Sequence, residues 1–506
     1  MKVLATILTS LILISHHPKE EVKPLKAQMY VSNHENVLGT SLEFKIISTS
    51  EKEVEKAEKA ALVEINRLSN IFSAYNSNSE FSKWMKSDLN KPIKVSKELF
   101  EMLSLFDDWK QRTNGALNPS VAVATKLWHE AALKRNRPSK AEIRKAISQM
   151  MAKHYVLDPS NLTATKLDQI PLVMNSFAKS YIINKACDAA LKEGKIENVV
   201  VNIGGDLVTK GTDTDLIHAT NPLENAENDP PIAKLMVMNR AVATSGNYRR
   251  GEQIGKNWYS HIIDPRTAKP VEEIISATVI AQNAVDAGAL ATAFNVLTLE
   301  ESRTLAEKSN AAYLIVTKEG KIVKSVNWDE YVVPNKIEEP IDELTKSSYA
   351  ENQKLWDPKF ELAINFKLNA IEDNSHRPYA AIWVENEKRE SVRNLALWYR
   401  KTNWIPDLRN WYRINGERFK ANKDNYASVT GATRNPGSYT VKWDGKDDKG
   451  NYVPQGKYTI IIETAKEHGT NEIIRQALEL RKAPIKTTNP GNVEVASASF
   501  EFGKKK

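Results

Sequence analysis

The sequence predicts an α+β domain followed by an all-β domain. The chain has 506 residues, more than one ordinary hydrophobic core accommodates, so at least two domains are expected. Up to about residue 335, segments with apolar side chains at helical spacing are interspersed with strand-like segments. Beyond about residue 355, short β-type runs with many aromatic side chains follow one another. The composition, 41% hydrophobic and 26% charged, is typical of a globular protein.

The first domain contains elements of both kinds. Between Val37 and Ile47, apolar and polar side chains alternate, as they do in a half-buried strand. Between Glu51 and Ile71, apolar side chains recur at helical spacing with Lys and Glu between them, which predicts an amphipathic helix. The other predicted elements are helices at Ser96–Thr113, Asn175–Lys192, Asp286–Leu297 and Leu299–Lys308, a strand at Val199–Val201, and a hairpin of Ala312–Val316 and Ile322–Val326.

The second domain is predicted to be a β-sandwich, because its strand-like runs are short and bounded by turn residues. After Trp443, the residues from Asp444 to Asn451 are rich in Asp and Gly, which supply turn geometry. This segment and the following Gly456-Lys457-Tyr458 resemble the W-D-G-x-D-x-x-G and G-x-Y pattern of small Ig-like modules, so an Ig-like sandwich is expected. The predicted strands are Phe360–Leu368, Tyr379–Glu385, Ser391–Tyr399, Ser438–Trp443 and Tyr458–Thr464.

The N-terminus has the pattern of an export signal. Met1-Lys2 precedes an apolar run from Val3 to Ile14, which is too short to span a bilayer as a helix. An uncleaved anchor or a plain N-terminal strand is the alternative, and membrane contact is expected only through an uncleaved segment. The expected organisation is a signal peptide or anchor at 1–17, a linker at 18–28, the first domain at 29–335, a linker at 336–354, the second domain at 355–490 and a tail at 491–506.

Charge and cysteine content exclude several classes of function. The net charge of +8 is modest for this length, and Lys and Glu alternate along most of the chain, so no nucleic-acid-binding stripe is expected. Cys187 is the one cysteine, which excludes a disulfide within the chain and a cysteine metal cluster. Its alanine-rich helical surroundings predict a buried structural thiol.

Three segments between residues 173 and 293 carry residue types suited to binding or catalysis. The glycines Gly204 and Gly205 follow a predicted strand and allow a ligand to approach the backbone, although a tight structural turn explains them equally well. Ser245 lies in a segment with two hydroxyls and a glycine in one turn. His261 is flanked by a hydroxyl, an Asp and an Arg, so the segment could combine a base with an anion clamp, or could be an ordinary turn.

Taken in order, these segments resemble the ApbE family, the FAD:protein FMN transferases, over roughly residues 30–330. The region from about 355 to 485 resembles DUF2271, a domain of unknown function that is often fused behind ApbE domains. The resemblance implies a bacterial protein exported to the periplasm or cell envelope, with an α+β fold. It also implies cleavage of the FAD pyrophosphate with Mg²⁺ and attachment of FMN through its phosphate to a Thr hydroxyl of a target protein. The matching strings are Gly115–Ser120, Ala178-Lys179, Val201–Asp206, Ala243–Tyr248, Ser260–Thr267 and Ala289–Ala293.

The resemblance also implies roles for individual residues. His261 is the candidate for orienting or activating the acceptor hydroxyl, and it is also expected to contact the flavin. The main-chain oxygen of Ser176 and the hydroxyl of Thr292 are the implied metal ligands. The implied FAD contacts are Leu38, Tyr75, Ala116, Leu117, Asn118, Lys179, Gly204, Gly205, Ser245 and His261.

Several positions depart from the family pattern. Gly288 replaces the Asp that would pair with Thr292 as a metal ligand one helical turn away. Asn118 and Asn247 replace two further Asp residues, and the segment from Val173 to Ser180 lacks the family's Asp and three glycines. Asp286 is rotated by about 200° from position 288 on a helix and cannot simply substitute. The Mg²⁺ site is therefore expected to be weakened or lost, and a catalytically degenerate flavin- or partner-binding envelope protein is the alternative function.

The second domain contains a candidate flavin acceptor. Its segment Ser428–Thr433 resembles the acceptor motif D-x-x-[ST]-G-A-T of FMN-modified proteins, with Ala427 at the Asp position. Asn435-Pro436-Gly437 follows and predicts an exposed turn. Thr433 is the possible acceptor of FMN, a plain loop is the alternative, and a target protein that carries such a motif is the expected partner.

Overall fold

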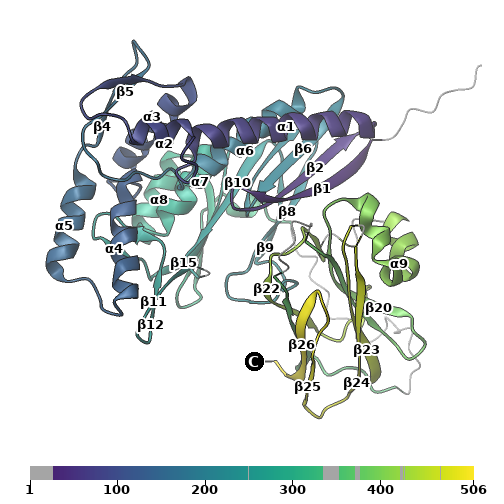
Figure 1. Cartoon of the computed structure of the whole chain (residues 1–506). Helices are drawn as coiled ribbons and strands as arrows, with labels where there is room; N and C mark the ends of the chain where they lie inside the picture. The colour runs from purple at the N-terminus through teal and green to yellow at the C-terminus, as the bar shows by residue number, and fades with distance from the viewer. Residues whose placement is uncertain are drawn as a thin grey trace, which may run out of the picture.

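The computed structural model describes residues 27–248, 250–333, 353–370, 377–421, 426, 428–467 and 469–505. They form an N-terminal region with an eight-stranded sheet and a C-terminal region with two further sheets (Figure 1). The predicted signal segment at 1–17 and most of the linker at 336–354 lie outside the described residues. Within them, no helix is long and apolar enough to cross a membrane.

The eight-stranded sheet is the framework of the N-terminal region. Every neighbouring pair in it is antiparallel. The strands, in their order across the sheet, are β1 (Gln28–Val37), β2 (Thr40–Ser48), β6 (Ile196–Ile203), β7 (Asp206–Gly211), β10 (Arg240–Gly246), β15 (Ile274–Ala281), β16 (Ala312–Thr317) and β17 (Ile322–Lys324).

Each face of this sheet buries its own apolar cluster, as the period-two alternation of strands requires. In β6, Val199 and Val201 belong to the main cluster with the helices, whereas Val200 between them packs with Trp328 on the opposite face. The longer helices that contribute to the main cluster are α1 (Glu51–Phe72), α3 (Lys97–Arg112), α6 (Ala178–Leu191), α7 (Ala284–Phe294) and α8 (Leu299–Lys308). The hairpin of β8 (Asp215–Ala219) and β9 (Ala233–Val237) covers the opposite face together with Trp328.

Smaller elements extend the N-terminal region at the side where α4 and α5 lie in Figure 1. Trp128 on α4 and Met150 on α5 share a third apolar cluster with Tyr259. These elements are α2 (Glu80–Met85), β3 (Pro92–Lys94), α4 (Ala122–Leu133), α5 (Lys140–Met151), β4 (Tyr155–Asp158), β5 (Thr163–Lys166), β11 (Gly251–Ile254), β12 (Asn257–Ser260), β13 (Ile263–Asp264) and β14 (Lys269–Pro270).

The C-terminal region consists mostly of strands in two sheets that contribute side chains to one buried apolar cluster. The prediction of an all-β domain is wrong in one respect, because helix α9 (Arg409–Ala421) packs Trp411 and Phe419 against the five-stranded sheet in a second cluster. The four-stranded sheet has the order β22 (Gly437–Trp443), β18 (Phe360–Leu368), β26 (Val495–Lys504), β25 (Ile485–Asn489). The five-stranded sheet has the order β21 (Thr430–Gly431), β20 (Ser391–Trp398), β19 (Tyr379–Glu385), β23 (Gly456–Ala465), β24 (Asn471–Leu480).

Two sequence predictions for this region have different outcomes. Residues placed in a tail form β26, which pairs with β18 and β25 and buries Phe500 and Phe502, so they are a core strand. The Asp/Gly turn after Trp443 is confirmed, because the Asp447 carboxylate accepts hydrogen bonds from the main-chain N–H groups of Lys449 and Asn451.

The two regions cover each other's exposed sheet edges. On edge strand β1, the N–H of Asn33 donates a 2.7 Å hydrogen bond to the main-chain oxygen of Arg400. On edge strand β22, Glu227 N–H donates to the oxygen of Thr440 at 2.8 Å, and Arg434 forms an ion pair of 2.9 Å with Glu227. Because uncovered strand edges invite unwanted pairing, this arrangement stabilises both regions in the assembled chain.

Strongly periodic segments match their predicted bounds closely. The helix from Leu299 to Lys308 and the strands at Phe360–Leu368 and Tyr379–Glu385 are confirmed as α8, β18 and β19. The predicted strand from Val37 to Ile47 is interrupted by a turn at Leu38 and Gly39, both with positive φ, so that β1 and β2 form a hairpin. Cys187 is fully buried, as predicted, and burial raises the pKa of its thiol to about 12.

Candidate functional site

The loop before α6 contacts the last turn of α7 through the two predicted metal ligands. Thr292 Oγ1 on α7 donates a hydrogen bond of 3.2 Å to the main-chain oxygen of Ser176. Two oxygens that bind one Mg²⁺ as neighbours lie about 3.0 Å apart, because each Mg–O distance is about 2.1 Å. The spacing of these two oxygens therefore suits a shared cation, although neither oxygen carries a charge.

Gly288 lies one turn before Thr292 on α7 and is buried. A Cβ atom built on Gly288 would lie 2.2 Å from Ser180 Oγ, 3.1 Å from Ser180 Cβ and 3.4 Å from Phe177 Cβ. Real Cβ atoms essentially never approach another heavy atom within 3.0 Å, so a side chain at position 288 requires Ser180 to move. The Ser180 hydroxyl thus occupies the space that a carboxylate side chain at position 288 would enter.

The Asp206 carboxylate, at the start of β7, binds the Ser180 hydroxyl from the other side. Ser180 Oγ donates a hydrogen bond of 3.1 Å to Asp206 Oδ2, and Lys179 Nζ lies 3.3 Å from the same oxygen. Burial raises the pKa of the Asp206 carboxyl above its ordinary value, and the Lys179 ammonium and Ser180 hydroxyl counteract this shift. The two groups thereby compensate a carboxylate that would be costly to bury alone.

These residues do not fit the magnesium site that the resemblance implies. Mg²⁺ sites in proteins rely on one or two carboxylates besides neutral oxygens, and position 288 supplies none. Across the described part of the chain, no group of three or more His, Cys, Asp or Glu residues could hold a metal ion. The narrow space beside Asp206, between Ser180 and Ala287, does not admit a water molecule.

The sequence predicts that Asp286 cannot replace the carboxylate missing at position 288, and the structure agrees. Helix α7 begins at Ala284, and the side chain of Asn283 caps it by accepting hydrogen bonds from the N–H groups of Val285 and Asp286. Asp286 is therefore inside the helix, and its Oδ1 lies 3.8 Å from Nη1 of Arg112. Burial raises the pKa of its carboxyl, and Arg112 opposes that shift.

The predicted glycine turn lies beside the β1–β2 hairpin that contains Leu38. Gly204 and Gly205 join β6 to β7, and the N–H of Gly204 donates to the main-chain oxygen of Ser41 at 3.2 Å. Gly204 has φ +57°, and a Cβ there would lie 2.7 Å from Cγ2 of Thr40. The structure thus brings Leu38, Gly204 and Gly205 to one place, where the turn also has a structural reason to be glycine.

Asn118 and Asn247, which replace Asp residues of the family pattern, both donate to buried main-chain oxygens. Asn118 Nδ2 donates to the oxygen of Met150 at 2.8 Å, and Asn247 Nδ2 donates to the oxygen of Ile274 at 2.7 Å. A carboxylate cannot donate these hydrogen bonds. The side chains of Ala116 and Leu117 are core residues, so only their main-chain atoms could reach a ligand.

Two further predicted contacts, Tyr75 and Ser245, each accept a hydrogen bond from an asparagine. The Tyr75 ring is 85% exposed, and Asn175 Nδ2 donates to its hydroxyl at 3.4 Å. Asn295, at the end of α7, donates to the main-chain oxygen of Ser245 at 3.1 Å. An exposed ring at this position is available to stack on a planar group.

His261 has one ring nitrogen fixed by the main chain. Nδ1 lies 3.0 Å from the main-chain oxygen of Arg250, and a carbonyl oxygen only accepts, so Nδ1 carries the proton and Nε2 is the acceptor of the neutral ring. Desolvation lowers the pKa of the imidazole below its ordinary value, and the charge of Arg250 acts in the same direction. The lowered pKa favours the neutral ring, in which Nε2 can act as an acceptor.

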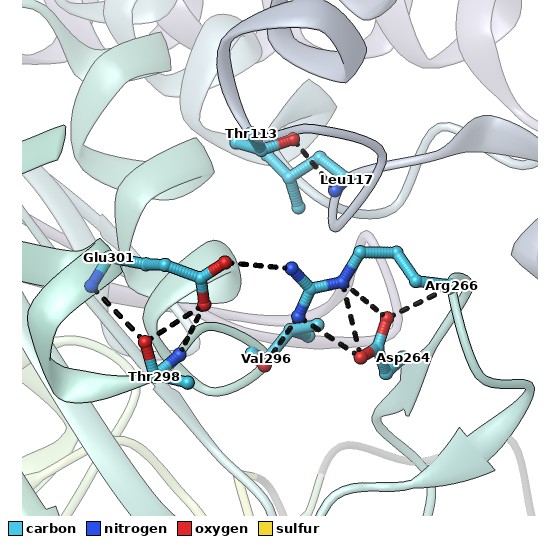
Figure 2. Close-up of polar contacts among 7 residues, drawn as sticks. All are labelled: Thr113, Leu117, Asp264, Arg266, Val296, Thr298 and Glu301. Atoms are coloured by element: carbon cyan, nitrogen blue, oxygen red, sulfur yellow. Dashed lines mark hydrogen bonds and ion pairs between the residues drawn. The ribbon is translucent and has the colours of Figure 1, made fainter.

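The contacts of Arg266, the arginine that follows His261, favour the ordinary-turn alternative for this segment (Figure 2). Arg266 Nε contacts both carboxylate oxygens of Asp264, at 3.0 and 3.2 Å, and Nη1 lies 3.1 Å from Oε1 of Glu301. Nη2 also donates to the main-chain oxygen of Val296 at 3.3 Å, and the Asp264 contacts raise the pKa of the guanidinium. Arg266 thus joins this loop to α8. The charge of its guanidinium is already compensated by the carboxylates of Asp264 and Glu301.

The candidate acceptor Thr433 does not lie in an exposed turn, so that prediction is wrong. Thr433 is 2% exposed, and its hydroxyl donates to the Glu35 carboxylate of β1. Arg377 Nε lies 3.5 Å from the other oxygen of Glu35. Docking of the C-terminal region against β1 buries the segment, and sequence alone could not show this contact. Ala427 of the motif lies outside the described residues.

Sequence reasoning did not assign a role to Ser180 or Asp206. Both belong to quoted segments, Ser180 at the end of the segment that begins at Val173 and Asp206 after the glycine turn. The sequence does contain a signal, because relative to the family pattern a side chain is gained at position 180 (Gly to Ser) and a side chain is lost at position 288 (Asp to Gly). The two changes in volume are opposite in sign. Only the structure shows that these two positions are in contact.

Comparisons with known proteins agree with this architecture. The family model described as "ApbE family" matches residues 38–315, and the one described as "Predicted periplasmic protein (DUF2271)" matches residues 361–497. The chain is 30% identical over 294 residues to an FAD:protein FMN transferase of Haemophilus influenzae, covering 55% of this chain and 83% of that protein. It is 25% identical over 269 residues to the Escherichia coli K12 protein of the same name, covering 50% of this chain and 75% of that protein.

Solved structures show the same fold for the N-terminal region. The crystal structure of the ApbE protein of Thermotoga maritima is similar with a TM-score of 0.53 and 26% identity, covering 60% of this chain and 99% of that chain. The apo flavinyl transferase ApbE of Pseudomonas stutzeri is similar in fold, with a TM-score of 0.51 and 21% identity, covering 61% of this chain and 98% of that chain.

Proposed function

This chain belongs to the ApbE family and has a DUF2271 domain behind it, and we propose that it is an FAD-binding protein of the FAD:protein FMN transferase type that lacks magnesium-dependent transfer. The observation that carries this proposal is the pair of Gly288 and Ser180. Position 288 has no carboxylate, and the Ser180 hydroxyl lies where such a side chain would enter. The alternative of a catalytically degenerate flavin-binding protein thus has stronger support than full activity.

Several residues support flavin binding. The Lys179 ammonium is 30% exposed beside the α6 terminus and can bind a phosphate oxygen. The exposed Tyr75 ring and the turn of Gly204 and Gly205 offer a flat face and a close backbone approach to a planar group. Leu38 lies in the hairpin against that turn. We propose these residues as flavin contacts of this chain.

Magnesium-dependent FMN transfer is the second candidate function, and it is favoured by the identity to curated transferases. In that reaction His261 would accept the proton of the target Thr hydroxyl at Nε2, since Arg250 fixes the proton of the ring on Nδ1. The partner would then be a protein with a D-x-x-[ST]-G-A-T-like motif. The missing carboxylate at position 288 is the observation against this candidate.

Two further proposals concern the location of the protein and the fold type of its C-terminal region. We propose export to the periplasm or cell envelope, supported by the apolar N-terminal run and by the description of the DUF2271 match as a periplasmic protein. We also propose an Ig-like classification for the C-terminal region, supported by two sheets that share one core.

The test is a calorimetric titration of the full chain with FAD, with and without Mg²⁺, combined with mass detection of AMP and FMN adducts in the presence of an acceptor peptide. We expect FAD to bind and neither AMP nor an adduct to form. Absence of binding under both conditions would contradict the flavin-binding proposal. Release of AMP with an FMN adduct on the peptide would establish the second candidate instead.

A further inference from the structure

We propose that Ser180 and Gly288 act as a coupled pair that excludes divalent cations, and that Lys179 supplies the positive charge that the buried Asp206 carboxylate requires. The proposal concerns the metal specificity of the site and holds whether or not FAD binds. It rests on contacts among α6, α7 and the start of β7.

The first step is steric. With glycine at position 288, Ser180 Oγ can lie 2.2 Å from the place of the absent Cβ. Any side chain at 288 would force Ser180 into another rotamer, and rotation would break its hydrogen bond to Asp206. Glycine at position 288 thus leaves the room that the Ser180 hydroxyl needs for its hydrogen bond to Asp206. A side chain added at position 288 alone would break that hydrogen bond.

The second step is electrostatic. Asp206 is buried, and a buried carboxylate requires a cation or several hydrogen-bond donors. Lys179 Nζ and Ser180 Oγ both contact the same oxygen, Oδ2, at 3.3 and 3.1 Å. The carboxylate is thus already compensated, so a cation entering here would have to displace the lysine and the hydroxyl.

The third step concerns the oxygens that remain. Ser176 and Thr292 still place two oxygens 3.2 Å apart, close to the spacing of neighbouring Mg²⁺ ligands. Position 288 lies four residues before Thr292 on the same face of α7, so a carboxylate there would point toward these oxygens once Ser180 is removed. Two substitutions together, Ser180→Gly and Gly288→Asp, are therefore required to open a cation site.

The experiment titrates Mn²⁺ alone into the full chain and follows free Mn²⁺ by electron paramagnetic resonance. We expect no saturable binding for the parent, S180G or G288D, and one equivalent of Mn²⁺ bound by the double variant. Gly456→Asp is the matched control, because it adds the same charge where no atom lies within 4 Å of the built Cβ.

Three results would overturn the proposal. The first is one equivalent of Mn²⁺ on the parent that is lost in Asp206→Asn. The second is binding by G288D as tight as by the double variant, and the third is a folded double variant that binds no Mn²⁺. Circular dichroism shows whether the double variant folds. If it does not, two other measurements test the proposal: the Mn²⁺ titration of the parent, and the change in unfolding free energy caused by Gly288→Ala in the parent and in S180G. Equal effects of Gly288→Ala in both backgrounds would then refute the coupling.

Discussion

Replacing Gly288 by alanine should destabilise this protein, although glycine to alanine in a helix interior ordinarily stabilises. Alanine gains about 1 kcal/mol over glycine inside a helix. At position 288 the new methyl group would lie 2.2 Å from Ser180 Oγ, so the hydroxyl must rotate away. The hydrogen bond to the Asp206 carboxylate is then lost, and hydrogen bonds to charged groups contribute about 1.5–3 kcal/mol.

Crowding adds to this cost, because Ser180 Cβ and Phe177 Cβ would remain 3.1 and 3.4 Å from the methyl group. Overpacking of a well-packed interior costs about 1–3 kcal/mol. Taking low values for both costs and subtracting the helix gain leaves a net destabilisation of about 1.5 kcal/mol for Gly288→Ala. In the S180G background the hydrogen bond and both Ser180 contacts are absent and only the 3.4 Å approach to Phe177 Cβ remains, so the same substitution should stabilise by about 1 kcal/mol.

The assay is equilibrium urea unfolding of the parent, both single variants and the double variant, analysed as a double-mutant cycle. A coupling energy of about 2.5 kcal/mol between the two positions is expected, with unchanged dependence on urea concentration so that the comparison is valid. A stabilisation by Gly288→Ala in the parent, or a coupling within about 0.5 kcal/mol of zero, would refute the steric reasoning.

Three further predictions concern the surroundings of the site. Desolvation lowers the pKa of His261 in the folded chain below 6.5, so an NMR titration of the imidazole should have its midpoint below that value, and a midpoint above 6.5 would contradict the prediction. The stability that the neutral imidazole contributes is present above the unfolded pKa and is lost as the pH falls through the folded pKa. Asn247→Asp should destabilise by about 2–3 kcal/mol in urea unfolding at pH 7, because a carboxylate would face the Ile274 oxygen, whereas Asn247→Asp without loss of stability would show that this hydrogen bond is unimportant. Arg434→Ala removes the ion pair with Glu227 between the two regions and should cost about 1–2 kcal/mol, with faster proteolysis between the regions as the measurement, and an unchanged cleavage rate would argue against a stabilising interface.

Local sequence patterns predicted much of the fold. The helix from Leu299 to Lys308 has a capping box, in which Thr298 and Glu301 exchange hydrogen bonds, and its bounds are determined within the segment itself. The strands at Phe360–Leu368 and Tyr379–Glu385 are bounded by changes in residue type that can be read without knowledge of their partners. The bounds of such elements can be predicted from the sequence because they depend on interactions between residues that are close together in the chain.

Other features depend on partners far away in the chain. Nothing in the short sequence of β26 identifies β18 as its neighbour, so the sequence alone predicts a tail there. Helix α9 was missed because its place is decided by burial of Trp411 and Phe419 against a sheet formed by other segments. Thr433 was expected in an exposed turn, and its burial follows only from the docking of the C-terminal region on β1.

The site shows the same division. The sequence by itself determined the family, the loss of a carboxylate at position 288 and the inability of Asp286 to replace it, because these follow from residue identity and helical geometry. Only the tertiary structure decided that Ser180 fills the vacated space and binds Asp206 with Lys179. The physical reason is that van der Waals exclusion and charge compensation act between atoms in contact, and the fold decides which atoms those are.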